Sequence, residues 1–255
     1  MTVFEAIVLG LVQGLTEFLP VSSSGHLLLA GRIMGFSTLS LGFELVCHLG
    51  TLLAVFLVLR KELWALVKKP LSRPVRVLVL ASACTAVVAG IFSVFLRDLL
   101  DGSLLVYCFI ITGILLLSCG FMPQKRTEIG YGDAAVIGLM QGVACLPGLS
   151  RSGTTIASAQ LLGVEREKAA QFSFILSVPV ILGSSVIELA LHGLGSTNAG
   201  VLALLSAFAA SFLGGLFAVR FLLRLLKKHS LDWFAVYLFM LSAFMLLNDY
   251  ALHLF

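Results

Sequence analysis

Charged residues are scarce in this sequence. Asp, Glu, Lys and Arg make up 12% of its 255 residues, whereas a typical soluble domain carries about 25%. Hydrophobic residues make up 59%, and the mean hydropathy is +1.07. A water-soluble fold of this length needs more polar surface than this sequence contains. The composition therefore excludes a water-soluble domain and predicts an integral membrane protein.

Three other kinds of signal are missing. The N-terminal segment has neither a basic region nor a small-residue cleavage site, so we expect no cleaved signal peptide. The five cysteines form no CxxC motif and no His-paired metal pattern, and we expect them to be small apolar residues of a helix bundle. The net charge of +4 does not predict binding to nucleic acid, because the basic residues gather in loops between apolar runs.

Long apolar runs are abundant instead. Six of them have about the ~20 residues that a helix needs to cross ~30 Å of hydrocarbon, and the turns between them carry Pro, Gly, Ser or charge. The six expected spans are residues 42–59, 75–96, 104–121, 168–192, 200–223 and 232–253.

The Lys and Arg residues predict the orientation of these spans. Residues 60–76, 122–132, 165–168 and 220–229 hold 14 of the 17 Lys and Arg residues. Because basic loops stay on the cytoplasmic side, we expect these four segments inside. The alternate loops and the C-terminus are then expected outside.

Two stretches remain, residues 1–41 and 133–164. By the charge count, each begins and ends on the same side of the membrane. Each also contains two helix-length pieces that a polar break with Pro and Gly separates. This pattern predicts a re-entrant helical hairpin, which is tolerated at membrane depth only when protein or a wet cavity surrounds it.

The two breaks resemble each other. Residues 10–25 read GLVQGLTEFLPVSSSG, and residues 138–153 read GLMQGVACLPGLSRSG; at an offset of 128, seven of the 16 positions are identical. We therefore expect one all-α membrane domain over residues 1–255, built from two repeats of about 1–127 and 128–255. Each repeat has one re-entrant hairpin and three transmembrane helices. Three spans are an odd number, so the second repeat is expected to be inverted, with the two breaks facing each other.

The first break carries polar groups that are costly inside a membrane. Gln13 and Glu17 are four residues apart and share one helix face, and an ionisable group at this depth usually marks function. Gln13 alone could instead serve helix packing. Ser22 and Ser23 precede a helical run, where they are either plain N-caps or part of an anion site. His26 follows within one turn and is either a base beside a hydroxyl or a packed histidine.

The second break supplies a positive charge. Arg151 lies between Ser150 and Ser152, and Thr155 follows in the next turn. The serines again precede a helical run, which predicts a second anion-binding nest. Arg151 fits either a phosphate, through its planar fork, or an ion pair with a carboxylate such as Glu17.

Together the breaks carry the groups that phosphoryl transfer uses: a carboxylate beside an amide, a hydroxyl near an imidazole, and an arginine beside two helix N-termini. A divalent metal ion could join Glu17 to substrate oxygens. Glu44 and His48, four residues apart near the end of a span, are weaker candidates that could support the first hairpin. Polar residues near other span ends are expected to reach the membrane surface; these are Glu188, Asp249 and His253.

The motifs at residues 13–26 (QGLTEFLPVSSSGH) and 147–155 (PGLSRSGTT) resemble the two signatures of bacterial undecaprenyl-diphosphate phosphatase, the bacitracin-resistance protein family. The resemblance covers essentially the whole chain. It implies a multi-pass protein of the bacterial inner membrane that hydrolyses undecaprenyl diphosphate to the monophosphate and phosphate, recycling the lipid carrier of peptidoglycan synthesis. It also implies a divalent cation, Mg²⁺ or else Ca²⁺, and a pocket that opens toward the periplasm.

The resemblance also implies roles for individual residues. Gln13 and Glu17 occupy the acidic metal-binding pair, and Glu17, Ser23, His26 and Arg151 are the catalytic set. Ser22, Ser150, Arg151, Ser152 and Thr155 would bind the substrate phosphates. Ser23 or His26 could attack phosphorus, and both assignments stay open. Many relatives have Glu at the position of Gln13, so this site has one fewer negative charge for a metal ion.

The partners expected from the resemblance are a polyprenyl diphosphate and membrane lipid, with a homodimer as an option for the assembly. The rival hypothesis is a transporter or flippase for a polyprenyl phosphate, because inverted repeats with broken helices are typical of transporters. A transporter needs an anion site but no base beside a hydroxyl. A second family of lipid phosphatases is not matched, because its Ser-Arg and His-Asp pattern does not follow the Ser-Gly-His of this chain.

Overall fold

The computed structural model describes all residues except 37, 96–103, 193–198 and 249–255. The described part is helical, and its single β pairing is an isolated bridge between Arg126 and Val164. This agrees with the expected all-α class, since a helix satisfies its own backbone hydrogen bonds in lipid. The helices are α1 (Val3–Phe18), α2 (Ser23–Ile33), α3 (Leu41–Val58), α4 (Arg60–Lys68), α5 (Arg73–Phe95), α6 (Leu105–Ser118), the 3₁₀ helix η2 (Cys119–Phe121), α7 (Tyr131–Val143), α8 (Arg151–Leu161), α9 (Arg166–His192), α10 (Val201–Leu225) and α11 (Asp232–Leu247).

Among the described residues, four helices are long and apolar enough to cross a membrane: α3, α5, α9 up to Ile187, and α10. Together with the composition, they make the chain a multi-pass membrane protein. Two further expected spans are shorter apolar helices. The span 104–121 is α6 continued by η2, and the span 232–253 is α11, which ends at Leu247. The rest of the latter span, with Asp249 and His253, lies outside the described residues.

The prediction of a loop over residues 60–76 is partly wrong, because this segment contains the helix α4. None of the α4 residues is buried, and the Lys68 ammonium lies 5.6 Å from the centre of the Trp64 ring. The basic residues of this segment made it look like a loop. Basic and apolar side chains on one short helix are instead typical of a helix at a membrane surface.

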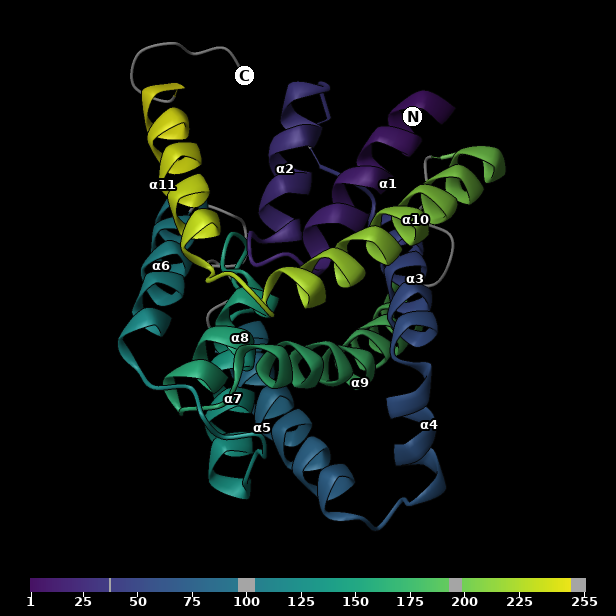
Figure 1. The fold of residues 1–255 in the computed structure, drawn as a ribbon. Coiled ribbons are helices and arrows are strands. Elements are labelled where there is room, and N and C mark those ends of the chain that lie inside the picture. Colours follow the sequence, from purple (N-terminus) through teal and green to yellow (C-terminus); the bar gives the residue numbers. More distant parts are fainter. Residues whose placement is uncertain (37, 96–103, 193–198, 249–255) are drawn as a thin grey trace.

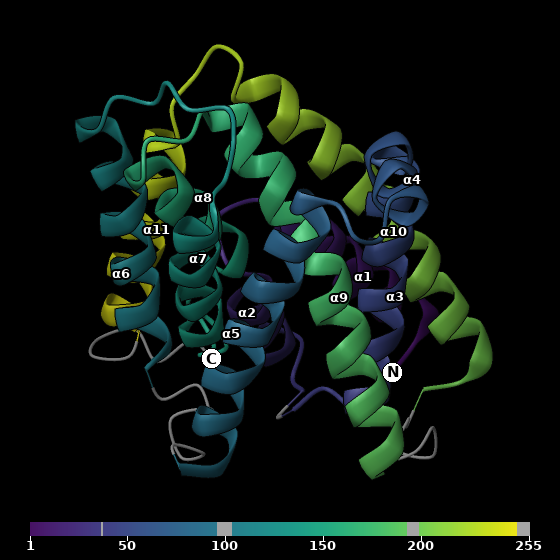
Figure 2. The ribbon, with the colours of Figure 1, turned by 90° about the horizontal axis from the view of Figure 1, so that it is seen from below.

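Two pairs of glycines set the positions of α1 and α7. A Cβ on Gly10 would lie 2.6 Å from the Ala207 carbonyl oxygen of α10, and one on Gly138 would lie 2.3 Å from the Ala81 carbonyl oxygen of α5. Gly14 and Gly142, one turn later, are equally close to α10 and α5. Small residues four apart let helices approach closely in membranes. α1 therefore packs on α10, and α7 on α5 (Figures 1 and 2).

The turns that end α1 and α7 both lie toward the middle of the molecule, with α1 and α2 on one side and α7 on the other (Figure 1). The buried core passes close to these turns. Phe18, the last residue of α1, packs edge to face against Phe174 of α9, with ring centres 5.3 Å apart. The long helices thus hold the two polar breaks near each other.

Candidate functional site

The first break follows directly from its sequence. Pro20 favours extended backbone at Leu19, and α1 ends one residue earlier. Ser22 then has a φ of +70°, a left-handed value that is rare outside glycine. This sharp turn starts α2 at Ser23, and the Ser22 hydroxyl caps the new helix by accepting from the Gly25 N–H at 3.4 Å. The turn brings Ser23 back toward the end of α1.

Glu17 is the centre of the site. Its side chain is almost fully buried, and its Oε1 accepts a hydrogen bond from the Arg151 guanidinium. Its Oε2 accepts from the Gln13 amide at 2.7 Å and from the Ser23 hydroxyl at 2.5 Å. His48 Nε2 lies 3.8 Å from the same oxygen. Four helices therefore direct polar side chains to one carboxylate, which offsets the cost of burying its charge.

The second break has the same cap but a different turn. Gly148 has a φ of +90° and lies so close to α6 that a Cβ there would be 2.6 Å from the Leu105 carbonyl oxygen. Ser150 caps α8 by accepting from the Gly153 N–H at 3.0 Å, as Ser22 caps α2. The glycine makes the turn here, whereas Ser22 makes it in the first break.

The two breaks touch at two places. One is the ion pair between Arg151 and Glu17, and the other is the Ser152 hydroxyl, which donates to the Leu19 carbonyl oxygen at 3.0 Å. Both contacts are consistent with two breaks that face each other. The ion pair is one of the two uses of Arg151 that the sequence left open.

A cavity of about 340 Å³ opens beside these groups. Five of the predicted site residues line it: Glu17, Ser22, Ser23, Ser150 and Arg151. The other predicted residues do not line it. Gln13 is fully buried and bonds to Glu17, Ser152 bonds to the first break, and the Thr155 hydroxyl bonds to Ser173 and to its own helix.

His26 is not among the residues that line this cavity, and its contacts are those of a packed histidine, one of the two uses that the sequence left open. Its Nδ1 lies 2.8 Å from the Ser22 carbonyl oxygen, so this nitrogen carries the proton. Its Nε2 therefore accepts from the Tyr237 hydroxyl at 2.6 Å. Both ring nitrogens of His26 are thus occupied by the Ser22 carbonyl and the Tyr237 hydroxyl, and the imidazole at the cavity is that of His48.

Several cavity residues were not singled out from the sequence. They come from three helices: Thr85 of α5, Gln141 of α7 and Ser184 of α9. Gln141 stands at the position that matches Gln13 in the repeat, so the internal similarity was a usable signal. Its amide donates to the Thr85 hydroxyl at 3.0 Å, and its Oε1 has no hydrogen-bond partner. Nothing local in the sequence points to Thr85 or Ser184.

The site residues offer few ligands for a divalent cation. Within the described ranges, no three His, Cys, Asp or Glu side chains gather in a way that could hold a metal ion. The Gln13 Oε1, however, is buried without a partner, close to the Glu17 carboxylate. One carboxylate and one amide oxygen suit a Mg²⁺ ion that takes its other ligands from water and substrate phosphates.

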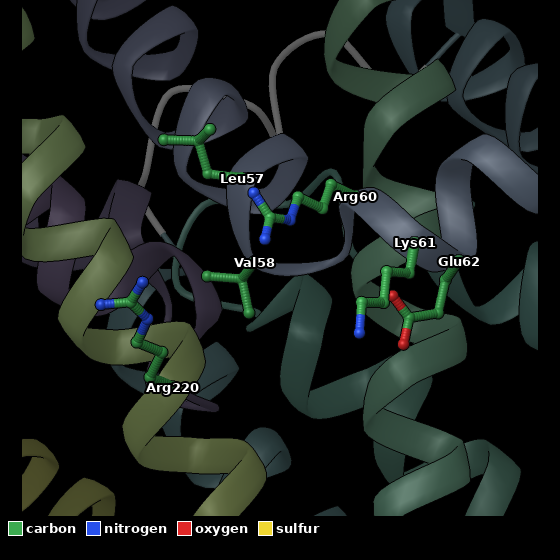
Figure 3. A pocket seen from close by; sticks show the side chains of 6 residues that line it. All are labelled: Leu57, Val58, Arg60, Lys61, Glu62 and Arg220. Carbon is green, nitrogen blue, oxygen red and sulfur yellow. The ribbon is translucent and has the colours of Figure 1, made fainter.

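The arrangement suits an anion with a reactive phosphorus. Helices α2 and α8 begin at the cavity, and their N-termini carry partial positive charge. Arg151 adds a full positive charge, and the Ser23 hydroxyl donates to the Glu17 carboxylate. A second hollow, of about 460 Å³, lacks this combination (Figure 3). It lies where α3, α4 and α10 meet, and its polar residues are Arg60, Lys61, Glu62 and Arg220.

Comparisons with known proteins agree on one family. Residues 6–244 match the family model described as bacitracin resistance protein BacA. A protein of Carboxydothermus hydrogenoformans named undecaprenyl-diphosphatase is 41% identical, with 95% of each chain covered. Proteins of the same name from Christiangramia forsetii and Methanobrevibacter smithii are 38% and 36% identical, covering 98% and 100% of this chain and 100% of each relative.

Proposed function

The chain belongs to the BacA family of bacitracin resistance proteins, and from this we propose that it is a membrane phosphatase of undecaprenyl diphosphate. It hydrolyses the diphosphate to undecaprenyl phosphate and inorganic phosphate, which recycles the lipid carrier of peptidoglycan synthesis. The observation that carries this function is the meeting of Glu17, Ser23 and Arg151 at one cavity. The transporter hypothesis is not favoured, because a serine hydroxyl held on a carboxylate has no use in transport.

Binding of the diphosphate begins at Arg151 and the two helix N-termini. The guanidinium offers parallel N–H donors to phosphate oxygens, and the caps at Ser22 and Ser150 place backbone N–H groups at the cavity. When Arg151 turns to the substrate, it leaves the Glu17 carboxylate. Its Oε1 is then released from the guanidinium, while its Oε2 still accepts from the Ser23 hydroxyl.

Ser23 is the nucleophile in this proposal. Its Oγ attacks the terminal phosphorus, its proton passes to Glu17 Oε2 at 2.5 Å, and the bond from phosphorus to the bridging oxygen breaks. Undecaprenyl phosphate leaves with that oxygen. Glu17 passes the serine proton to that oxygen as the product leaves, and it is again a carboxylate. Water then attacks the phosphorus of the phosphoserine and gives a proton to Glu17. The bond from phosphorus to Ser23 Oγ breaks, and this oxygen takes the proton back from Glu17, which releases inorganic phosphate. His26 positions the turn through the Ser22 carbonyl and has no proton-transfer step.

Gln13 Oε1 and Glu17 would hold a divalent cation, Mg²⁺ or else Ca²⁺. When bound, the ion supplies positive charge to the phosphate oxygens in the transition state. Gln13 also donates to Glu17, so it orients the carboxylate in the absence of the ion.

The repeat and its inversion belong to the same proposal. α1 and α7, α2 and α8, and α5 and α10 each begin 128 residues apart (3 and 131, 23 and 151, 73 and 201), the offset of the two motifs. The charge count supports hairpins that enter from opposite sides. We place the protein in the inner membrane with the cavity open toward the periplasm. A homodimer stays a prediction, which light scattering on the purified protein would test.

The test uses the purified protein in detergent with undecaprenyl diphosphate and Mg²⁺. Wild type is expected to release inorganic phosphate, and Ser23→Ala to lose at least a hundredfold of this rate. Ser206→Ala, a partly exposed serine of α10 whose hydroxyl donates to the Leu202 carbonyl oxygen, is the control and should keep the wild-type rate. If wild type releases no phosphate, the phosphatase function is wrong. If Ser23→Ala works at full rate, Ser23 is not the nucleophile.

A further inference from the structure

An apolar groove of about 780 Å³ runs between α5 and α9. Side chains from both helices line it, among them Leu78, Val79 and Ala86 of α5 and Pro179 and Ile187 of α9. Apart from Thr85 and three serines, its lining residues are apolar or glycine. A groove of this composition suits a hydrocarbon chain and offers little to a charged headgroup.

The groove is continuous with the polar cavity. Thr85 and Ala89 of α5 and Val180 and Ser184 of α9 line both spaces. An apolar space therefore joins the cavity that holds Glu17, Ser23 and Arg151. A molecule with a diphosphate at one end and a hydrocarbon chain at the other could occupy both at once.

Two glycines keep the groove wide. A Cβ added to Gly90 of α5 or to Gly183 of α9 would meet no atom within 4 Å, and both glycines line the groove. Glycine is unfavourable inside a helix, and in membranes it usually serves close helix contact. Gly10 and Gly138 serve such contacts, whereas the Cβ positions of Gly90 and Gly183 face open space and not a neighbouring helix. Packing does not explain these two glycines, whereas space for a ligand does.

We propose that the groove between α5 and α9 binds the first isoprene units of the substrate tail while the diphosphate occupies the polar cavity. This inference rests on the proposed phosphatase function. Burying the start of the tail removes apolar surface from contact with water and headgroups. The groove thus adds affinity for a prenyl diphosphate over a diphosphate that lacks a tail.

The test fills the groove from each side with Gly183→Phe and Gly90→Phe. The controls are Val186→Phe and Val87→Phe, on the same helices at exposed positions that do not line the groove. For each protein, kcat/KM is measured for undecaprenyl diphosphate and for isopentenyl diphosphate, whose tail is a single unit. The two groove variants are expected to lower the ratio of the long-tail to the short-tail value at least tenfold, mainly through KM. The controls should keep the wild-type ratio.

A crosslinking experiment locates the tail without depending on these variants. Ser23→Ala protein in phospholipid vesicles is irradiated with a prenyl diphosphate that carries a diazirine on its first isoprene unit, and labelled peptides are identified by mass spectrometry. We expect labels on residues 78–93 of α5 and 179–187 of α9.

The outcomes are separable. An unchanged ratio in both groove variants, or labels confined to other helices, overturns the groove as the tail site. Equal labelling of the groove by a diazirine phospholipid makes it a general lipid site and also overturns the proposal. If wild type releases phosphate from neither substrate, the phosphatase function itself is wrong. Labelling of the groove by the prenyl diphosphate would still support tail binding there in that case.

Discussion

At the scale of single residues, the Glu17 carboxylate organises the site. Donors from α1, α2 and α8 converge on its two oxygens, so a change in any one of them alters the other contacts. Arg151 is the partner with a full charge, and it is shared between Glu17 and the incoming substrate in our proposal. Changing one partner of Glu17 should therefore alter catalysis or stability in a way that depends on the carboxylate.

Arg151→Lys tests the bidentate contact with phosphate. We expect kcat/KM for undecaprenyl diphosphate to fall about 100-fold, or about 2.7 kcal/mol, because a point charge cannot offer two parallel donors. The control is Arg32→Lys, an exposed arginine at the end of α2, which should keep the wild-type value. Phosphate-release kinetics near the wild-type value in Arg151→Lys would contradict this role.

Gln13→Glu tests the proposed cation site. A second carboxylate beside Glu17 is costly without a metal ion, because two like charges repel in a buried place. With Mg²⁺ the same pair should bind the ion more tightly. We expect a lower Tm than wild type in EDTA and a larger rise of Tm on adding Mg²⁺, measured by thermal unfolding in detergent. If Mg²⁺ does not change the Tm of Gln13→Glu, Gln13 is not part of the cation site.

The motifs pointed to residues that the structure brings to one cavity, and the catalytic roles of these residues stay predictions. Glu17, Ser23 and Arg151 could be predicted because an ionisable or nucleophilic group beside a helix break is unusual inside a membrane. The contact between His26 and Tyr237 could not be predicted, because it joins residues 211 positions apart. Thr85 and Ser184 reach the cavity through the packing of α5 and α9, and their neighbours in sequence resemble any apolar helix.

At the scale of helices, close glycine contacts fix the breaks in place. Gly14 lies against the backbone of α10, where an added Cβ would be 2.4 Å from the Ser211 carbonyl oxygen. This contact lies one turn before Glu17. A small shift of α1 would therefore move the carboxylate relative to Arg151.

Gly14→Ala is expected to push α1 away from α10. Overpacking of this kind costs about 1–3 kcal/mol, so we expect Tm in detergent to fall by several degrees and phosphate release to fall with it. Gly90→Ala is the matched control for stability, since its Cβ meets no atom within 4 Å and alanine favours the helix. A Tm of Gly14→Ala equal to that of the control would show that the contact is not tight in the protein.

Hydrophobic length predicted the long helices well, since α3, α5, α9 and α10 fall where the apolar runs do. It failed at α4, because this short helix contains charged residues and has no long apolar run, so a search for apolar length assigns it to a loop. The turns differ for a similar reason. Equivalent positions carry Ser22 and Ser150, but the left-handed residues are Ser22 and Gly148, a backbone detail that residue identity alone does not specify.

At the scale of the whole molecule, the distribution of charge predicts how the bundle sits in the membrane. The segments with most of the Lys and Arg residues include α4 with the chain that leads from it to α5, and the end of α10. Both should face the cytoplasm. From the same count we expect the C-terminus to face the periplasm, on the side where we expect the cavity to open.

A reporter fusion tests this orientation directly. Green fluorescent protein fused after Phe255 should give little fluorescence, because this reporter does not mature when exported in an unfolded state, whereas alkaline phosphatase fused there should be active. The same two reporters inserted after Lys69, between α4 and α5, should behave in the opposite way, because six Lys and Arg residues lie in 60–76. A fluorescent C-terminal fusion would reverse the orientation. The cavity would then open to the cytoplasm, and the phosphatase would have to take its substrate from the inner leaflet.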